Sequence, residues 1–238
     1  MLLDSGESLF HGDYWTTSTD PDQGALLIEA MSAMGYEAMA LGARDLDALL
    51  STVKARFEDV QSAILSANVR VNGALPNVQP YHLRQIDGHT VGIVGVTSEQ
   101  VEDRFEALGL DLTVEDPITA VGQVVDEVRK RADIIILLST LEQSQARELA
   151  QAVPGIDAIV GTSRGVQHTP VAIAGVENEV VLHASGMQGE YLGVLHLHFD
   201  AQGHITEFEG RSMPLTDYYE DDAQMVEIIR RYASASRP

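Results

Sequence analysis

The chain has 238 residues, 45% of them hydrophobic, which is enough for one large domain or two small ones with a substantial core. Its 36 acidic residues outnumber its 15 basic ones, and the net charge of −21 argues against nucleic acid or an anionic membrane surface as a partner. The absence of cysteine excludes disulfides and thiolate chemistry, and no apolar run reaches the roughly 18 residues of a membrane span.

Strands and helices alternate in the pattern predicted for the first third of the chain. Apolar residues at helical spacing predict a helix that Gly35 ends, and Gly42 opens a tight turn after the strand that follows. In order, the expected elements are a strand over 1–4, a helix over 27–34, a strand over 38–41 and a helix from about residue 45.

The middle of the chain predicts further strands and one hairpin. Asp87-Gly88 between two apolar runs indicates a tight β-turn. Asp116-Pro117 supplies an N-cap and a first-turn proline for a helix. The expected elements are strands over 63–69, 81–86 and 90–96, an irregular acidic segment over 98–116, a helix from residue 117, a buried strand over 132–138, a helix over 142–151 and a strand over 156–160.

The last third predicts strands in succession and then one helix. Glycine, asparagine and aspartate turns separate the strands, as in an antiparallel run. These strands cover 171–175, 179–184, 191–199 and 204–209, and the helix covers about 221–233. We therefore expect one α/β domain over residues 1–238, with two packed sheets and helices outside them.

Four turns follow apolar strands directly, and we expect them to converge on one crevice. Ligands and catalytic groups gather beyond the carboxyl ends of strands in open α/β sheets. The turns are Ser5-Gly6-Glu7, Gly42-Ala43-Arg44-Asp45, Ser139-Thr140-Leu141 and Gly161-Thr162-Ser163-Arg164-Gly165.

At these turns the chain resembles the metallophosphoesterase (calcineurin-like) family, specifically the N-terminal domain of 5'-nucleotidases. The resemblance implies an α/β/β/α sandwich of two sheets flanked by helices. It also implies that the family's first strand and the C-terminal nucleoside-binding domain have no counterpart in this chain. The segments that carry the resemblance are Leu2–Gly12, Glu29–Gly42, Ser66–Val69, Val91–Thr97, Val114–Pro117, Val153–Gly161 and Gly189–Gly193.

The family's chemistry is hydrolysis of phosphoesters by two divalent ions held by Asp, Asn and His. This sequence alters those positions: Glu7 replaces the bridging Asp, Ala43 and Arg44 replace Asn and His, Thr140 replaces a His, and Ser163 and Gly165 replace two more. Ala43 and Gly165 have no donor atom, and an arginine repels a divalent ion. The resemblance therefore implies the scaffold without its activity or its metal cofactor. We expect a non-catalytic binding or accessory subunit.

The substituted crevice has two interpretations. Arg44 and Arg164 could bind a small anion, with hydroxyl groups donating beside them. Alternatively, the two arginines pair with Glu7 and Asp45 and close the crevice. The candidate anion pocket consists of Arg44, Arg164, Thr140 and Ser163.

A hydrolase with a remodelled or single-metal site is the alternative function. It would use Glu7 with His11 or His183, while His168 lies in a turn nearby. None of these histidines has the spacing of a metal motif. His196 and His198 share one strand face, where two interpretations are open: a metal-chelating pair or a solvated surface. Beyond a small anion, the expected partner is another protein or a second copy of the chain. No signal peptide is visible, so the location stays open, although members of the family are often periplasmic or extracellular.

Overall fold

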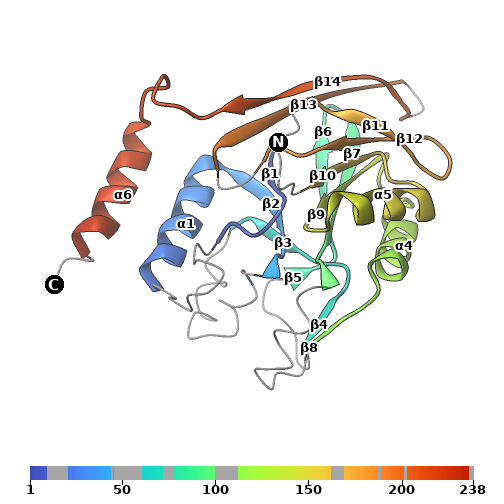
Figure 1. Cartoon of the computed structure of the whole chain (residues 1–238), viewed down its shortest axis with the longest axis horizontal. Coiled ribbons are helices and arrows are strands. Elements are labelled where there is room, and N and C mark those ends of the chain that lie inside the picture. Colours follow the sequence, from blue (N-terminus) through green and yellow to red (C-terminus); the bar gives the residue numbers. More distant parts are fainter. Residues whose placement is uncertain are drawn as a thin grey trace.

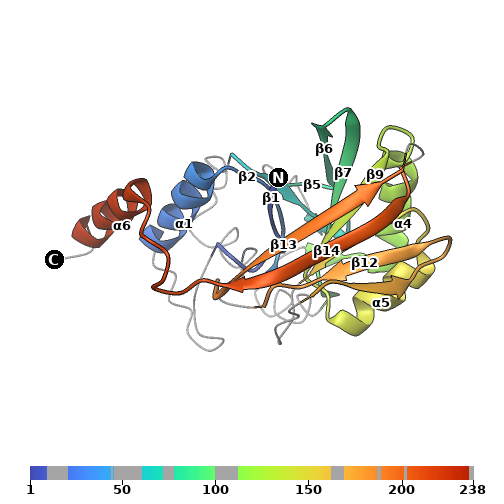
Figure 2. The ribbon, with the colours of Figure 1, turned by 90° about the horizontal axis from the view of Figure 1, so that it is seen from above.

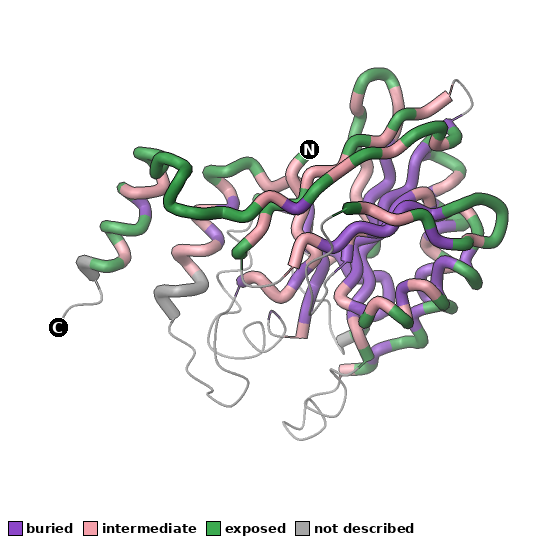
Figure 3. The backbone as a smooth tube through the Cα atoms, turned by 45° about the horizontal axis from the view of Figure 1, so that its top comes forward, coloured by how far each residue is buried: buried purple, intermediate pink, exposed green. Residues whose placement is uncertain are grey.

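The computed structural model describes residues 1–9, 21–43, 45, 61–71, 78–99, 112–161, 169–186, 189–200 and 203–235. These residues form a sandwich in which two sheets pack face to face between helices (Figure 1). Among the described residues, the buried ones gather on the inner strands of the sandwich (Figure 3). The expected α/β sandwich is confirmed, and within the described part no helix is long and apolar enough to cross a membrane.

The first sheet has four parallel strands in the order β1-β2-β3-β5. They are β1 (Leu2–Asp4), β2 (Tyr36–Ala40), β3 (Ala63–Leu65) and β5 (Val78–Gln79). Helix α1 (Pro21–Met34) covers the outer face and buries Ile28 and Met31 there. It ends where predicted, because Gly35 adopts a φ of 75° that favours glycine.

The second sheet has six strands in the order β11-β12-β10-β9-β7-β6. They are β6 (Tyr81–Ile86), β7 (His89–Val96), β9 (Ile134–Ser139), β10 (Ala158–Gly161), β11 (Val171–Ala174) and β12 (Glu179–His183). The four central strands run parallel, and the edge strands β6 and β11 are antiparallel to their neighbours. Every residue of β9 is buried, as expected for a strand covered on both faces.

Helices α4 (Pro117–Val128) and α5 (Gln143–Ala152) cover the outer face of this sheet. The predicted cap of α4 is confirmed, since Asp116 accepts the backbone N–H of Thr119 at 2.8 Å. The α4 residues Val121, Val125 and Val128 are buried against the sheet. These three valines form the apolar face that packs the helix onto the strands.

The two sheets approach each other closely at Gly95 of β7. A Cβ at this position would lie 2.2 Å from the backbone oxygen of Leu65 on β3. The backbone N–H of Ala67 donates to the Gly95 oxygen at 2.8 Å, so backbone bonds also join the two layers there. Between the sheets lies a core of buried side chains that includes Ala38, Ile93 and Leu138.

A long ribbon and a last helix complete the described part. Strands β13 (Tyr191–Phe199) and β14 (Ile205–Pro214) form the ribbon, which crosses the sandwich in Figure 2 and packs Leu197 and Phe208 onto the central core. Helix α6 (Ala223–Ala235) lies beside α1. There Glu29 accepts bonds from Arg231 at 2.5 Å and Tyr232 at 3.1 Å.

Several expectations about the elements need correction. The single strand predicted over 63–69 is two strands, β3 and β4 (Val69–Val71), because the chain turns between them. Strand β8 (Leu112–Val114) pairs with β4 inside the segment expected to be irregular. The C-terminal strands are two antiparallel pairs, and β12 also runs parallel to β10. The helix expected from residue 45 lies largely outside the described residues, although Ala43 and Asp45 are helical.

Candidate functional site

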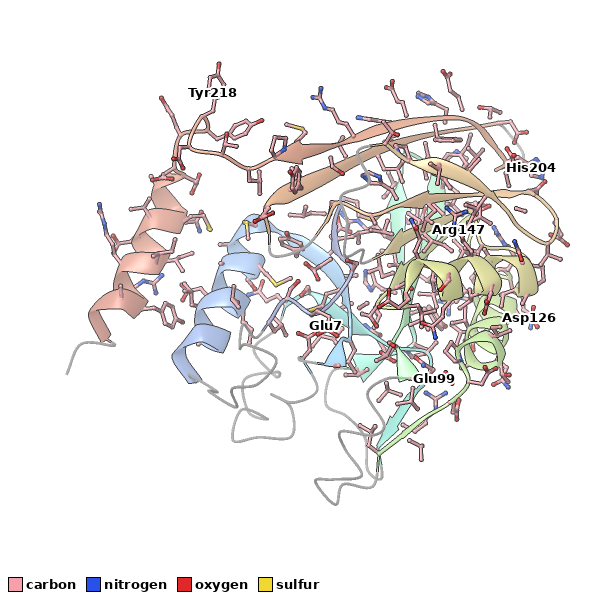
Figure 4. The ribbon with its side chains drawn as sticks, viewed as in Figure 1. Glu7, Glu99, Asp126, Arg147, His204 and Tyr218 are labelled. Carbon is pink, nitrogen blue, oxygen red and sulfur yellow. The ribbon has the colours of Figure 1, made fainter. Side chains whose placement is uncertain are left out.

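The turns after β1, β2 and β9 meet at the carboxyl ends of the strands, as the sequence predicted. Glu7 lies in the first turn (Figure 4), Gly42 and Ala43 in the second and Thr140 in the third. A Cβ on Gly6 would lie 2.7 Å from the Thr140 methyl carbon, so turns from different sheets are in contact. Gly161, at the end of β10, supplies no side chain to this edge.

Hydrogen bonds between side chain and backbone brace the first two turns against each other. The Glu7 backbone N–H donates to Asp45 Oδ2 at 3.0 Å, and the Gly42 backbone N–H donates to the same oxygen at 2.8 Å. Asp45 Oδ1 accepts the backbone N–H of Leu9 at 3.0 Å. In return, Glu7 Oε1 accepts the backbone N–H of Ala43 at 2.7 Å. The two carboxyl groups therefore hold backbone amides of the crevice walls.

Asp45 is fully buried, and this burial is the main cause of its shifted pKa. Burial raises the pKa of Asp45 to about 7, and the negative charge of Glu7 adds to the rise. Burial also raises the pKa of Asp4, although bonds from the Gly6 N–H at 2.7 Å and the Ser8 hydroxyl at 2.8 Å oppose it. Three acidic side chains thus share one end of the sandwich, and two of them bind protons more readily than an ordinary aspartate.

The backbone at Glu7 is strained to make this arrangement. Glu7 has a φ of 68° and follows Gly6 at 100°, and few residues other than glycine adopt such angles. Gly42 must also be a glycine, because a Cβ there would lie 2.6 Å from the Glu7 nitrogen. Strain of this kind persists only where surrounding bonds fix it. The bond that the Glu7 N–H donates to Asp45 and the bond that the Ala43 N–H donates to Glu7 Oε1 provide that fixation.

The Thr140 hydroxyl already has partners within the chain. It accepts the backbone N–H of Ser98 at 2.9 Å and bonds the backbone oxygen of Val96 at 3.4 Å. These bonds join the ends of β7 and β9. Thr140 was predicted to help bind an anion, and its hydroxyl joins two strands in this structure.

A buried polar network below the crevice was missed from the sequence. Asn68 donates from its amide to the Thr97 oxygen at 2.8 Å, and its Oδ1 accepts the Thr97 N–H at 2.9 Å. The Thr97 hydroxyl donates to the Leu41 oxygen at 2.7 Å and lies 2.9 Å from the Ser66 hydroxyl. In the sequence, Ser66 and Asn68 fell inside the strand predicted over 63–69, whereas in the structure they follow the end of β3 at Leu65.

Of the predicted histidines, the structure places three. His183 is buried at the end of β12 with 3% of its surface exposed, and neither ring nitrogen has a hydrogen-bond partner in the described structure. Burial lowers its pKa. His196 and His198 are exposed on β13, in keeping with a solvated face. The predicted residues Arg44, Ser163, Arg164, Gly165, His11 and His168 lie outside the described residues.

Comparisons with known proteins match this geometry. The chain is 28% identical to a 5'-nucleotidase of Rattus norvegicus over 254 residues, which cover 98% of the chain and 43% of that protein. It is 26% identical over 265 residues to the trifunctional nucleotide phosphoesterase YfkN of Bacillus subtilis, covering 94% of the chain and 18% of that protein. The chain is a relative of the 5'-nucleotidases. No family model matches it.

Solved structures show that this 5'-nucleotidase relative has the metallophosphoesterase fold. The 5'-nucleotidase precursor of Thermus thermophilus superposes with a TM-score of 0.83 at 23% identity, over 98% of this chain and 49% of that one. The calcineurin-like phosphoesterase YfkN of Bacillus subtilis gives 0.77 at 18% identity, over 99% and 83%. The chain spans less than half the length of the curated relatives described above.

The described residues of this 5'-nucleotidase relative do not fit a pair of divalent ions. Ala43 has no donor atom, the Thr140 hydroxyl bonds within the chain, and Glu7 Oε1 accepts a backbone amide. Across the part of the chain that the structure describes, no group of three His, Asp or Glu side chains is placed to hold a metal ion. Among the described residues, the side chains at positions 7, 43 and 140 therefore do not supply the complete donor set that two-metal hydrolysis requires.

Proposed function

We propose that this chain is a non-catalytic 5'-nucleotidase-like protein that acts as a binding or accessory subunit. The observation that carries the proposal is the bond between Glu7 Oε1 and the Ala43 backbone N–H at 2.7 Å. A carboxylate that bridges two ions supplies oxygen as a ligand to both, and neighbouring Asp, Asn and His donors complete the coordination of each ion. Glu7 directs one oxygen into the protein backbone instead, at the position where the family's bridging aspartate is expected.

The packing around Glu7 supports the same conclusion. The Thr140 methyl carbon sits against Gly6, and the Glu7 side chain sits against Gly42, where a Cβ would lie 2.8 Å from Glu7 Cδ. The turns that contain Glu7, Gly42 and Thr140 are thus packed directly against one another. Asp45 holds both turns through three backbone amides, so opening this contact would leave buried groups unbonded. This arrangement is suited to a rigid scaffold that presents its surfaces to a ligand or partner.

Metal uptake and phosphoester hydrolysis test the proposal directly. The purified chain is titrated with Mn²⁺ and Zn²⁺ by calorimetry and assayed with nitrophenyl phosphate and a nucleoside monophosphate. YfkN, named above as a nucleotide phosphoesterase, serves as the positive control. We expect no uptake of two ions and no turnover above the blank. Binding of two ions per chain, with turnover that a chelator abolishes, would overturn the proposal.

A single-metal hydrolase is the second candidate, and the observation in its favour is His183. Both of its ring nitrogens are buried without a hydrogen-bond partner in the described structure, which leaves them available as donors to a metal. Uptake of one ion per chain, with turnover lost in His183→Leu, would support this candidate over the non-catalytic one.

A further inference from the structure

A second hollow lies at the other end of the sandwich from the crevice. Its volume is about 580 Å³, within the range of small-molecule sites. It is lined by Tyr36 and Glu37 at the start of β2, whereas the crevice follows the end of that strand. Further lining comes from the residues before β3 and from β5 and β6. The hollow therefore opens where the edge strands of the two sheets face each other.

The strand period of β6 explains which side chains reach the hollow. Tyr81 and Leu83 pack toward the core under α4, and the Tyr81 hydroxyl donates to Glu127 of that helix at 2.8 Å. Successive side chains of a strand point to opposite faces. His82 and Arg84 therefore turn away from α4, and both line the hollow. Two nitrogen-bearing side chains reach it from one short strand.

Arg84 and Glu37 form an ion pair that leaves hydrogen-bonding groups unused. Arg84 Nε lies 3.2 Å from Glu37 Oε2, but Oε2 is buried and no described group makes a hydrogen bond to it. Within the described residues, the structure gives neither the Arg84 terminal nitrogens nor the His82 ring a further partner. The hollow thus holds donors on β6 without a further described partner, and on β2 an acceptor whose described contact is the ion pair with Arg84.

This combination selects a class of ligand. A guanidinium with two free nitrogens binds a carboxylate or phosphate group in a planar, bidentate way, and an imidazole N–H adds a third donor. The Glu37 carboxylate has lone pairs left to accept from a donor beside Arg84, such as a hydroxyl or ammonium group. The amide side chains of Gln61 and Gln79 and the hydroxyl of the buried Ser62 supply neutral contacts around these groups.

We propose that the hollow binds a small organic anion that also carries hydroxyl or ammonium donors, with Arg84 and His82 holding the anionic group and Glu37 accepting from the donor. The site is separate from the crevice and does not depend on whether the crevice hydrolyses anything. In a chain with a net charge of −21, such an anion would be held by local geometry rather than by the overall field.

The test is ligand binding to the full chain by calorimetry, with probes that separate the two parts of the proposed chemistry. Serine and lactate carry a carboxylate with a donor, and glycerol 3-phosphate carries a phosphate with donors. Acetate and inorganic phosphate present the anion without the organic donor group, and glycerol lacks the anion. We expect at least one of the first three probes to bind more tightly than its truncated counterparts. Serine or lactate would identify a carboxylate site, and glycerol 3-phosphate a phosphate site.

Variants locate the binding. Arg84→Gln should weaken the preferred probe by about tenfold or more, since a charged hydrogen bond is lost. The second variant, His82→Gln, removes the imidazole that is proposed to hold the anionic group together with Arg84. Arg211→Gln, at an exposed residue of β14, is the matched control and should change nothing. Glu37→Gln should weaken the probe with a donor and leave acetate or inorganic phosphate unweakened. The proposal is overturned if no probe binds the unmodified chain at millimolar concentration, or if Arg84→Gln and Arg211→Gln bind the preferred probe alike.

Discussion

Glu7 and Asp45 are 38 residues apart, and each holds the turn that contains the other. The Glu7 backbone donates to Asp45 at 3.0 Å, while the Glu7 side chain accepts from Ala43, two residues before Asp45. Because these bonds use the carboxyl groups of both turns, the site is organised by the protein's own backbone. The properties of Asp45 should then be visible in stability measurements.

The stability contribution of Asp45 should fall as pH rises. Burial raises its pKa from 3.8 to about 7, so between these values the folded chain binds more protons than the unfolded chain. The contribution is therefore complete below about pH 4 and is lost through pH 7. We expect the difference in unfolding free energy between the unmodified chain and Asp45→Asn to decrease over this window, by at most about 1.4 kcal/mol per pH unit. Urea unfolding at four pH values measures it, and a difference independent of pH would contradict the expectation.

The close approach of the sheets predicts a severe effect of one methyl group. Gly95→Ala would place a Cβ 2.2 Å from the Leu65 backbone oxygen, so the sheets must separate. We expect a loss of about 3 kcal/mol or more of unfolding free energy. Gly122→Ala is the matched control, since the nearest atom to its Cβ would be 4.0 Å away and the residue lies within α4. Alanine should stabilise that helix by up to about 1 kcal/mol. Similar melting temperatures for the two variants would refute the close approach.

The buried network predicts that Asn68 matters for stability more than its size suggests. Asn68→Ala would leave the backbone N–H and oxygen of Thr97 without their partners in the interior. We expect a loss of about 2 to 4 kcal/mol of unfolding free energy. Asn178→Ala, at an exposed turn between β11 and β12, should change stability by less than about 0.5 kcal/mol. Chemical denaturation of both variants at one pH makes the comparison, and equal effects would contradict it.

His183 predicts a pH effect of the opposite sign to that of Asp45. Burial lowers its pKa below 6.5, so in acid the unfolded chain binds more protons than the folded chain. Stability from this site is complete above pH 6.5 and is lost as pH falls below it. His183→Leu removes the titrating group, so relative to the unmodified chain it should gain stability between about pH 6.5 and 5. His196→Leu, at an exposed position, is the control. An unchanged difference between about pH 8 and pH 5 would argue against a buried neutral imidazole.

Local signals accounted for the parts of the fold that the sequence predicted well. The Asp87-Gly88 hairpin forms because both residues adopt positive φ, at 49° and 87°. The α4 cap at Asp116 and the buried strand β9 are equally local features. The pairing of β4 with β8 joins segments more than 40 residues apart. A three-residue strand has too few residues to show a period, so only the folded chain reveals it.

The candidate site was predicted in position but not in bonding. The turns at Glu7 and Thr140 meet as expected from the carboxyl ends of their strands. The sequence suggested Arg44 and Arg164 as partners of Glu7 and Asp45, and both arginines lie outside the described residues. Within the described residues, three backbone amides bind Asp45. Backbone donors carry no sequence signal, so no pattern could have indicated them. The hollow beside Arg84 was missed for a similar reason, because Glu37 and Arg84 meet across two different sheets.

The contact between α1 and α6 has a consequence for the order in which the chain gains structure. Glu29 and Arg231 are separated by 202 positions, and α6 meets the rest of the fold chiefly through α1. The entropy lost in closing so long a loop is not offset by contacts with α6 until α1 is packed on its sheet. The amides of α6 should therefore be among the last to acquire protection from solvent exchange and the first to lose it.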